Sequence, residues 1–122
     1  MPAVAPPGWP ADLGPPGTPD FEARVPGWLL DRCPPEVRQS FTIRRHPAAL
    51  AQVAVHHCAA AVAGQREAYR AARRDLGQAL SPQALDGVLT DLEAVGHDLV
   101  RTQREVGLVA EALAGRIWRE RL

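Results

Sequence analysis

The stretch SPQALDGVLTDLEAVGHDLVRTQREVGLVAEALAGRIW (residues 81–118) decides the fold. Its apolar residues recur every seven positions, in the series Leu85, Leu92, Leu99, Val106 and Leu113. This heptad spacing places the apolar side chains on one face of an α-helix, as in coiled coils. Ser81 is a suitable N-cap and Pro82 fits a first helical turn, so the sequence predicts a long helix over about residues 82–118.

A second long helix is predicted over about residues 47–80. Pro47 fits its first turn, and no further proline occurs before Pro82. The apolar series of this stretch is Val55, Val62, Tyr69 and Leu76. When the chain folds back at Ser81, the two series meet pair by pair, from Leu76 beside Leu85 to Val55 beside Val106. The sequence therefore predicts an all-α fold built on a long antiparallel two-helix hairpin.

The N-terminal part of the chain has a different composition. Residues 1–34 hold nine of the twelve prolines, which fix φ and remove backbone donors. We therefore expect no regular structure before Pro26, and a flexible Pro/Gly-rich arm over residues 1–25. Residues 26–122 are expected to form the hairpin domain, which begins with a short helix over about residues 35–41.

The open end of the hairpin is predicted to be apolar on more than its inner face. Two helices alone cannot enclose so much apolar surface, so something must cover it. The sequence leaves three candidates: the segment 28–43 of the same chain, a second copy of the hairpin, or another protein. We expect a homodimeric four-helix bundle, and an interaction surface for self-assembly and for a protein partner at Leu50, Val53, Val100, Leu108 and Trp118.

No arrangement of residues in the sequence predicts catalysis. His56, His57 and Cys58 are consecutive, and consecutive helical residues point about 100° apart, so they cannot bind one metal ion together. We expect no bound metal, no cofactor and no enzymatic activity. A metal or haem site assembled from His56 and His57 of two chains is a further hypothesis.

Charge gives the main alternative function. The 14 Arg residues balance the 14 Asp and Glu residues, which argues against a generally basic nucleic-acid-binding protein. Arg66, Arg70, Arg73 and Arg74 nevertheless fall on one side of the first long helix. Such a stripe can contact the phosphates of a nucleic acid. The competing interpretation is a solvated helix face in a chain that uses Arg in place of Lys.

Composition also bears on where the protein works. The chain contains no Lys and no Asn, which is typical of a GC-rich, bacterial genome. Cys33 and Cys58 are too few for a disulfide scaffold and are expected to be reduced. The proline-rich start leaves no room for the apolar core of a signal peptide, and residues 47–64 are too polar to cross a bilayer. We therefore expect a cytoplasmic protein of about one domain that does not bind membranes.

Overall fold

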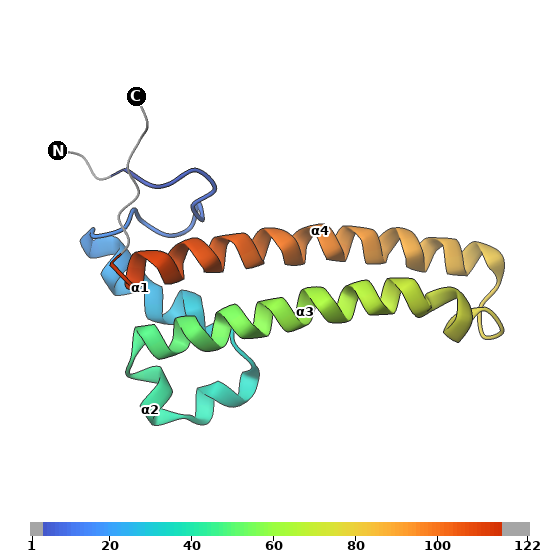
Figure 1. Cartoon of the computed structure of the whole chain (residues 1–122), viewed down its shortest axis with the longest axis horizontal. Helices are drawn as coiled ribbons and strands as arrows, with labels where there is room; N and C mark the ends of the chain where they lie inside the picture. The colour runs from blue at the N-terminus through green and yellow to red at the C-terminus, as the bar shows by residue number, and fades with distance from the viewer. Residues whose placement is uncertain (1–3, 116–122) are drawn as a thin grey trace.

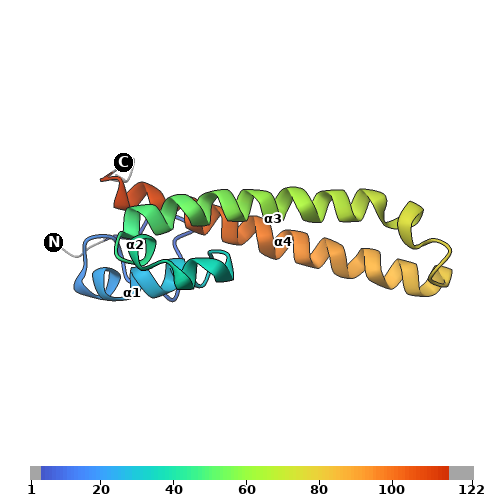
Figure 2. The ribbon, with the colours of Figure 1, turned by 90° about the horizontal axis from the view of Figure 1, so that it is seen from below.

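The computed structural model describes residues 4–115 and contains helices and no strands in that range (Figure 1). In chain order, the elements are α1 (Pro19–Leu30), the 3-10 helix η1 (Pro35–Gln39), α2 (Phe41–Arg44), α3 (Pro47–Leu76) and α4 (Pro82–Leu113). The predicted all-α hairpin is confirmed, because α3 and α4 lie side by side and antiparallel over their length (Figures 1 and 2). None of the helices within residues 4–115 is both long and apolar enough to cross a membrane.

Both long helices begin as predicted and end earlier than predicted. Ser81 caps α4 by accepting a hydrogen bond from the Ala84 amide, and Pro82 occupies the first turn. The first helix stops at Leu76 rather than near residue 80, with Gly77 as its C-cap. The second stops at Leu113 rather than near residue 118, because Gly115 adopts a φ of 80° that ends helical geometry.

The register between the long helices follows the predicted pairing. Gln65 on α3 lies against Gly96 on α4, and its Nε2 donates to the Leu92 carbonyl at 2.7 Å. One turn further along, the Tyr69 hydroxyl donates to the Glu93 carboxylate at 3.0 Å. These cross-helix contacts fix which residues of α3 and α4 lie level with one another.

The expectation of no regular structure before Pro26 is wrong for residues 19–25, which belong to α1. Thr18 caps this helix by accepting a hydrogen bond from the Phe21 amide, and Pro19 lies at its first position. The helix buries one face, which consists of Phe21, Val25, Trp28 and Leu29. Their spacing of four, three and one is that of an amphipathic helix, a pattern that the density of prolines concealed.

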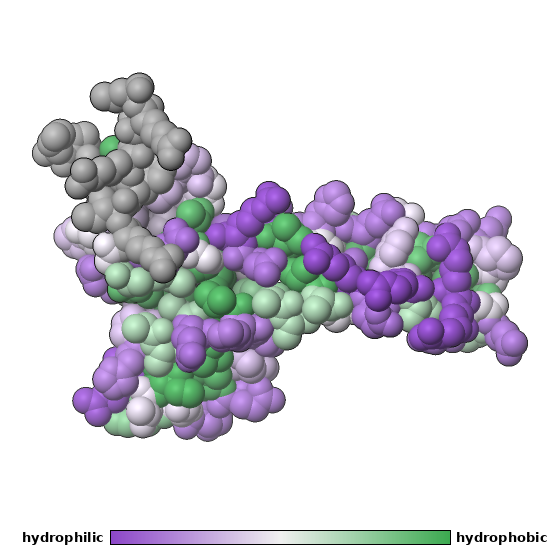
Figure 3. Space-filling view, viewed as in Figure 1, coloured by the Kyte–Doolittle hydropathy of each residue, from purple (hydrophilic) through white to green (hydrophobic). Residues whose placement is uncertain are grey.

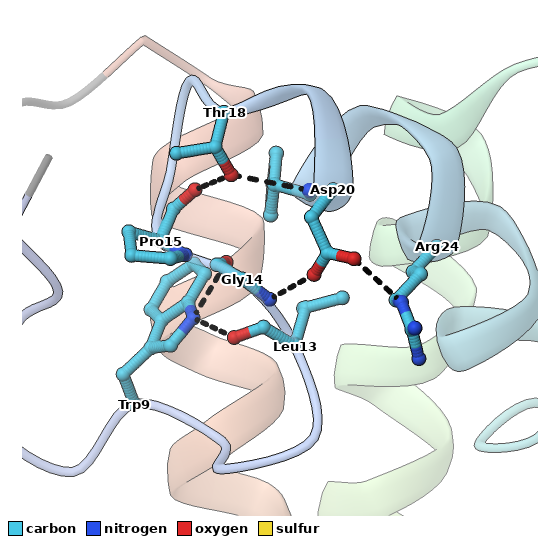
Figure 4. Close-up of polar contacts among 8 residues, drawn as sticks. Trp9, Leu13, Gly14, Pro15, Thr18, Asp20 and Arg24 are labelled. Carbon is cyan, nitrogen blue, oxygen red and sulfur yellow. Dashed lines mark hydrogen bonds and ion pairs between the residues drawn. The ribbon is translucent and has the colours of Figure 1, made fainter.

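Residues 4–18 contain turns and extended chain, but they are folded against the rest of the protein. The Trp9 indole donates hydrogen bonds to the carbonyls of Leu13 and Gly14, at 3.0 Å each (Figure 4). The Gly14 amide in turn donates to Asp20 on α1, and Leu13 is buried. Trp9 and Gly14 of the proline-rich segment therefore contact α1 and cap it.

The core lies at the open end of the hairpin, where α1 and the segment after it cover α3 and α4 (Figure 2). Trp28, Leu29, Cys33 and Val37 are buried there with residues of both long helices. Of the three candidate covers, the structure places the chain's own segment 28–43 on this end. The short helix expected over residues 35–41 is divided in two, because Ser40 ends η1 and caps α2.

Candidate functional site

A groove of about 820 Å³ runs between α3 and α4 on one face of the hairpin. Five arginines line it: Arg66, Arg70 and Arg73 from α3, and Arg101 and Arg104 from α4. Glu93 is the one carboxylate residue that the described part of the chain contributes to the lining. In Figure 3, hydrophilic side chains dominate the outer part of the hairpin, whereas apolar surface gathers nearer to α1 and α2. The groove is therefore a strongly basic concave surface.

Helical spacing explains why these arginines share one face. Arg66, Arg70 and Arg73 are four and three residues apart, which keeps them on one side of α3. On α4, His97, Arg101 and Arg104 repeat the same spacing, and all three line the groove. Because α3 and α4 pack antiparallel, the basic side of each helix faces the same groove.

Most of this positive charge is not neutralised within the hairpin. Arg70 pairs with Glu67 at 2.9 Å, and Arg101 pairs with Asp98 at 2.9 Å. Within residues 4–115, the side chains of Arg66, Arg73 and Arg104 have no carboxylate partner within ion-pair distance. Exposed ion pairs are weak, so even the paired arginines remain available to an anionic ligand.

Glu93 is held by Tyr69. The neutral Tyr69 hydroxyl donates to the Glu93 carboxylate, and this hydrogen bond, with the negative charge beside it, raises the pKa of Tyr69. The carboxylate is thereby tied across the helices to a phenol rather than to an arginine. Within residues 4–115, Glu93 forms no ion pair with a groove arginine, and the five guanidinium groups face this single carboxylate.

The floor of the groove is less polar than its sides. Tyr69, Gly96 and Val100 line it and are half-buried. Gln65 also lies here, but its amide is turned to the Leu92 carbonyl and fills the space beside Gly96. The groove thus combines an aromatic and aliphatic floor with arginine side chains.

The structure describes four of the five predicted protein-interaction residues. Leu50 is only 1% exposed, because the N-terminal segment covers it, so it has no free surface for a partner. Val53 is half-buried against the same core, and Leu108 is half-buried with its Cδ1 close to Gly8. Val100 lies apart from them in the groove, and Trp118 falls outside the described residues.

Most of the predicted arginine stripe lies on one surface, the groove. Arg66, Arg70 and Arg73 lie in the groove, whereas Arg74 is not part of its lining and pairs with Asp75 at 3.0 Å. Arg101 and Arg104 were not predicted from the sequence. The repeat of the same four-and-three spacing at His97, Arg101 and Arg104, read together with the hairpin register, is the signal that identifies them.

The remaining candidates from the sequence lie elsewhere. His56 and His57 are exposed, and within residues 4–115 no three His, Cys, Asp or Glu side chains are grouped to hold a metal ion. Cys33 and Cys58 are buried free thiols whose pKa values are raised by burial, and both line a second pocket of about 510 Å³. A raised pKa keeps a thiol protonated and unreactive.

Comparison of the chain with protein-family models, with curated proteins and with solved structures gives no match. A function is therefore inferred from the geometry and charge of the described residues.

Proposed function

We propose that this protein is a non-enzymatic binding protein that holds an anionic partner in the groove between α3 and α4. The observation that carries the proposal is the convergence of five arginines from two helices on one groove, against a single carboxylate residue among those described. Three of these arginines, Arg66, Arg73 and Arg104, have no carboxylate partner among residues 4–115. Arg binds carboxylates and phosphates through a planar set of donors, so both kinds of anion suit the groove.

The proposed binding surface differs from the one expected from the sequence. The apolar open end was the leading candidate from the sequence, but the chain's own residues 28–37 now occupy much of it. The groove keeps one residue of the original set, Val100, and three of the four arginines from the nucleic-acid hypothesis. Binding of a protein and binding of a nucleic acid thus become alternatives for one surface.

Charge reversal tests the proposal. Labelled polyglutamate and a labelled single-stranded oligonucleotide are titrated with wild-type protein and with the double variant Arg66→Glu/Arg73→Glu, and binding is followed by fluorescence anisotropy. We expect the wild-type chain to bind at least one probe, with affinity that falls as salt rises, and the variant to bind at least about tenfold more weakly.

Arg74→Glu, which reverses one charge rather than two, is the control and is compared with the loss per reversed charge. Arg74 follows Arg73 directly on α3 but is absent from the groove lining, so its reversal should change affinity by less than about twofold. Equal losses per reversed charge in the control and in the groove variant would point to general charge attraction and contradict the proposal. An unchanged affinity in the groove variant would contradict it as well.

We propose self-assembly as a second candidate function, because part of the hairpin's apolar series is left uncovered. Val95 on α4 lies seven residues after Val88, in a second apolar series three positions beyond the one that starts at Leu85, yet it is 47% exposed. A second copy packed on this face would give the four-helix bundle expected from the sequence. Light scattering on a sizing column tests this: a dimeric wild type that becomes monomeric with Val95→Asp, but not with Ala94→Asp, supports it. A monomeric wild type rejects it.

We further propose that the protein works in the cytoplasm. The support is that Cys33 and Cys58 are both free and buried, as thiols are in reducing compartments. Fractionation of cells that produce the protein, with labelling of free thiols, would test this location. Recovery in an extracytoplasmic fraction would reject it.

A further inference from the structure

We infer that the occupant of the groove is an acidic amphipathic helix of a partner protein. This inference rests on the proposed function, which requires only that the partner be anionic. It adds the secondary structure of the ligand and the pattern of its side chains.

The shape of the groove favours a helix. It follows two antiparallel helices, over Gln65 to Arg73 on α3 and over Glu93 to Arg104 on α4. A third helix commonly lies in such a groove, at about 8–10 Å from its neighbours. Toward the turn, at the level of Arg66 to Arg73, the hairpin is a two-helix layer, since α1 and α2 pack near the other end (Figures 1 and 2). A third helix would complete a three-helix bundle there.

The floor of the groove favours a ligand with an apolar face. Tyr69 and Val100 are half-buried in the hairpin and face the groove. A phosphate backbone has no apolar surface with which to cover Val100. An amphipathic helix covers such a floor with its apolar side chains, which is the usual mode of helix-in-groove recognition.

The course of the arginines favours a particular crossing angle. In the register that places Gln65 against Gly96, Arg104 lies level with His57, whereas Arg73 lies level with Val88. The basic side chains therefore cross the groove diagonally, from α4 to α3, over about 24 Å of the hairpin axis at about 1.5 Å per residue. A sideways shift of about 8–10 Å over that length corresponds to about 20°, which is the preferred crossing angle in helical bundles.

The pattern of the ligand follows from this course. A helix of about 16 residues spans the diagonal. Its carboxylates should flank the apolar face on the α4 side at one end, where they meet Arg101 and Arg104. At its other end they should flank the opposite side, where they meet Arg66 and Arg73. These are charge-assisted pairs to groups that lack a full set of partners in the hairpin.

Three labelled probes test the inference by fluorescence anisotropy. The first is a designed 16-residue peptide with leucines on one helical face and glutamates placed as above. The second has the same composition in an order that has no apolar helical face, and the third is a single-stranded oligonucleotide of 16 nucleotides. We expect the patterned peptide to bind at least about tenfold more tightly than the other two, and to gain helical circular dichroism on binding.

Two variants separate the contribution of charge to peptide binding from the contribution of the apolar floor. Arg66→Gln/Arg73→Gln removes charge without reversing it and should weaken peptide binding about tenfold. Val100→Ser should weaken binding of the patterned peptide by a similar factor and leave any binding of the oligonucleotide unchanged. Val100 is only half-buried, and thermal melts of each variant show that the hairpin still folds.

Each remaining outcome overturns the inference in a recognisable way. Equal binding of the two peptides would mean that the groove recognises charge alone. Binding of the oligonucleotide, but not of the peptides, with loss in the arginine variant would reject the helix while the proposed anionic partner stands. Binding of none of these probes, and of no polyglutamate, would reject the inference and the proposed function together.

Discussion

The side-chain amide of Gln65 reaches from α3 to the backbone carbonyl of Leu92 on α4 and donates a hydrogen bond of 2.7 Å. Gly96 makes this contact possible. A Cβ at that position would lie 2.7 Å from the Gln65 Nε2, closer than such atoms approach. Packing against Gln65 therefore explains the glycine at position 96. At Gly87, in the same helix, no atom lies within 4 Å of where a Cβ would be.

Alanine substitutions at these two glycines should have different effects on stability. Gly87→Ala should raise the free energy of unfolding by about 0.5–1 kcal/mol, because alanine is the better helix former and meets nothing. Gly96→Ala gains the same propensity but displaces the Gln65 amide, at a cost of about 0.5–1.5 kcal/mol for the lost hydrogen bond. Its net effect should be close to zero or destabilising. Urea denaturation measures both.

A double-mutant cycle provides the control. In a Gln65→Ala background there is no amide to displace, so Gly96→Ala should stabilise the protein as much as Gly87→Ala does. Equal stabilisation by Gly87→Ala and Gly96→Ala in the wild-type background would contradict this account of the contact.

The hairpin was predictable because its signals are local and periodic. Pro47 and Pro82 mark where helices begin, and the two heptad series predict which residues of one helix lie beside which residues of the other. α3 ends before Gly77, which keeps helical dihedrals, whereas α4 ends where Gly115 adopts a positive φ. Composition does not determine these backbone conformations. Helix starts were therefore predicted better than helix ends.

The fold of the N-terminal region was not predictable in the same way. The apolar face of α1 contains Phe21, Val25, Trp28 and Leu29, but Pro26 and Gly27 interrupt it and lower its helix propensity. What stabilises it is burial against the open end of the hairpin, a tertiary effect that overrides local preference. The prolines are a local signal, whereas the surface against which the helix packs comes from residues far along the chain.

Only the α3 side of the groove was predictable from the sequence. The arginines of α3 share a helix face, which spacing alone reveals. Their convergence with Arg101 and Arg104 depends on how α4 is rotated against α3. That rotation follows from contacts such as Gln65 with Gly96, which only the structure supplies.

Truncation of Leu29 should show that α1 is part of the core. Leu29 is fully buried, so Leu29→Ala should lower the free energy of unfolding by about 2–5 kcal/mol through lost burial and the cavity left behind. Val4→Ala, at a position that is 60% exposed, should change it by less than about 0.5 kcal/mol. Thermal or urea unfolding measures both. Equally small effects would mean that residues 19–30 do not pack on the hairpin.

Loss of the Thr18 cap should loosen the N-terminal segment. Its hydroxyl accepts from the Phe21 amide and donates to the Pro15 carbonyl, so Thr18→Ala should cost about 1 kcal/mol. Amide hydrogen exchange should accelerate in residues 19–25 and stay unchanged in α4. Thr90→Ala is the control, since the Thr90 hydroxyl donates to the Asp86 carbonyl within its own helix. Unchanged exchange near Phe21 in the Thr18 variant would contradict the role of the cap.

The ionisation of Tyr69 should report the contact between the two helices at the groove. Tyr69 is the chain's single tyrosine, so phenolate absorbance in a pH titration follows this residue alone. The hydrogen bond to Glu93, and then the charge of that carboxylate, raise the pKa of Tyr69 in the folded protein. Its unfolded pKa is about 10. The interaction therefore stabilises the fold fully below that pH, and this contribution is lost as pH rises through the higher folded value.

Glu93→Gln tests the cause of this shift. The amide accepts a weaker hydrogen bond than the carboxylate and carries no charge, so the midpoint of the Tyr69 titration should fall toward about 10. Glu67→Gln removes a carboxylate that pairs with Arg70 instead and should leave the midpoint close to that of the wild type. A wild-type midpoint already at the unfolded value, or a midpoint that does not move in Glu93→Gln, would show that Tyr69 and Glu93 do not hold one another in solution. In that case Glu93 would be free to pair with the groove arginines and to compete with an anionic ligand for them.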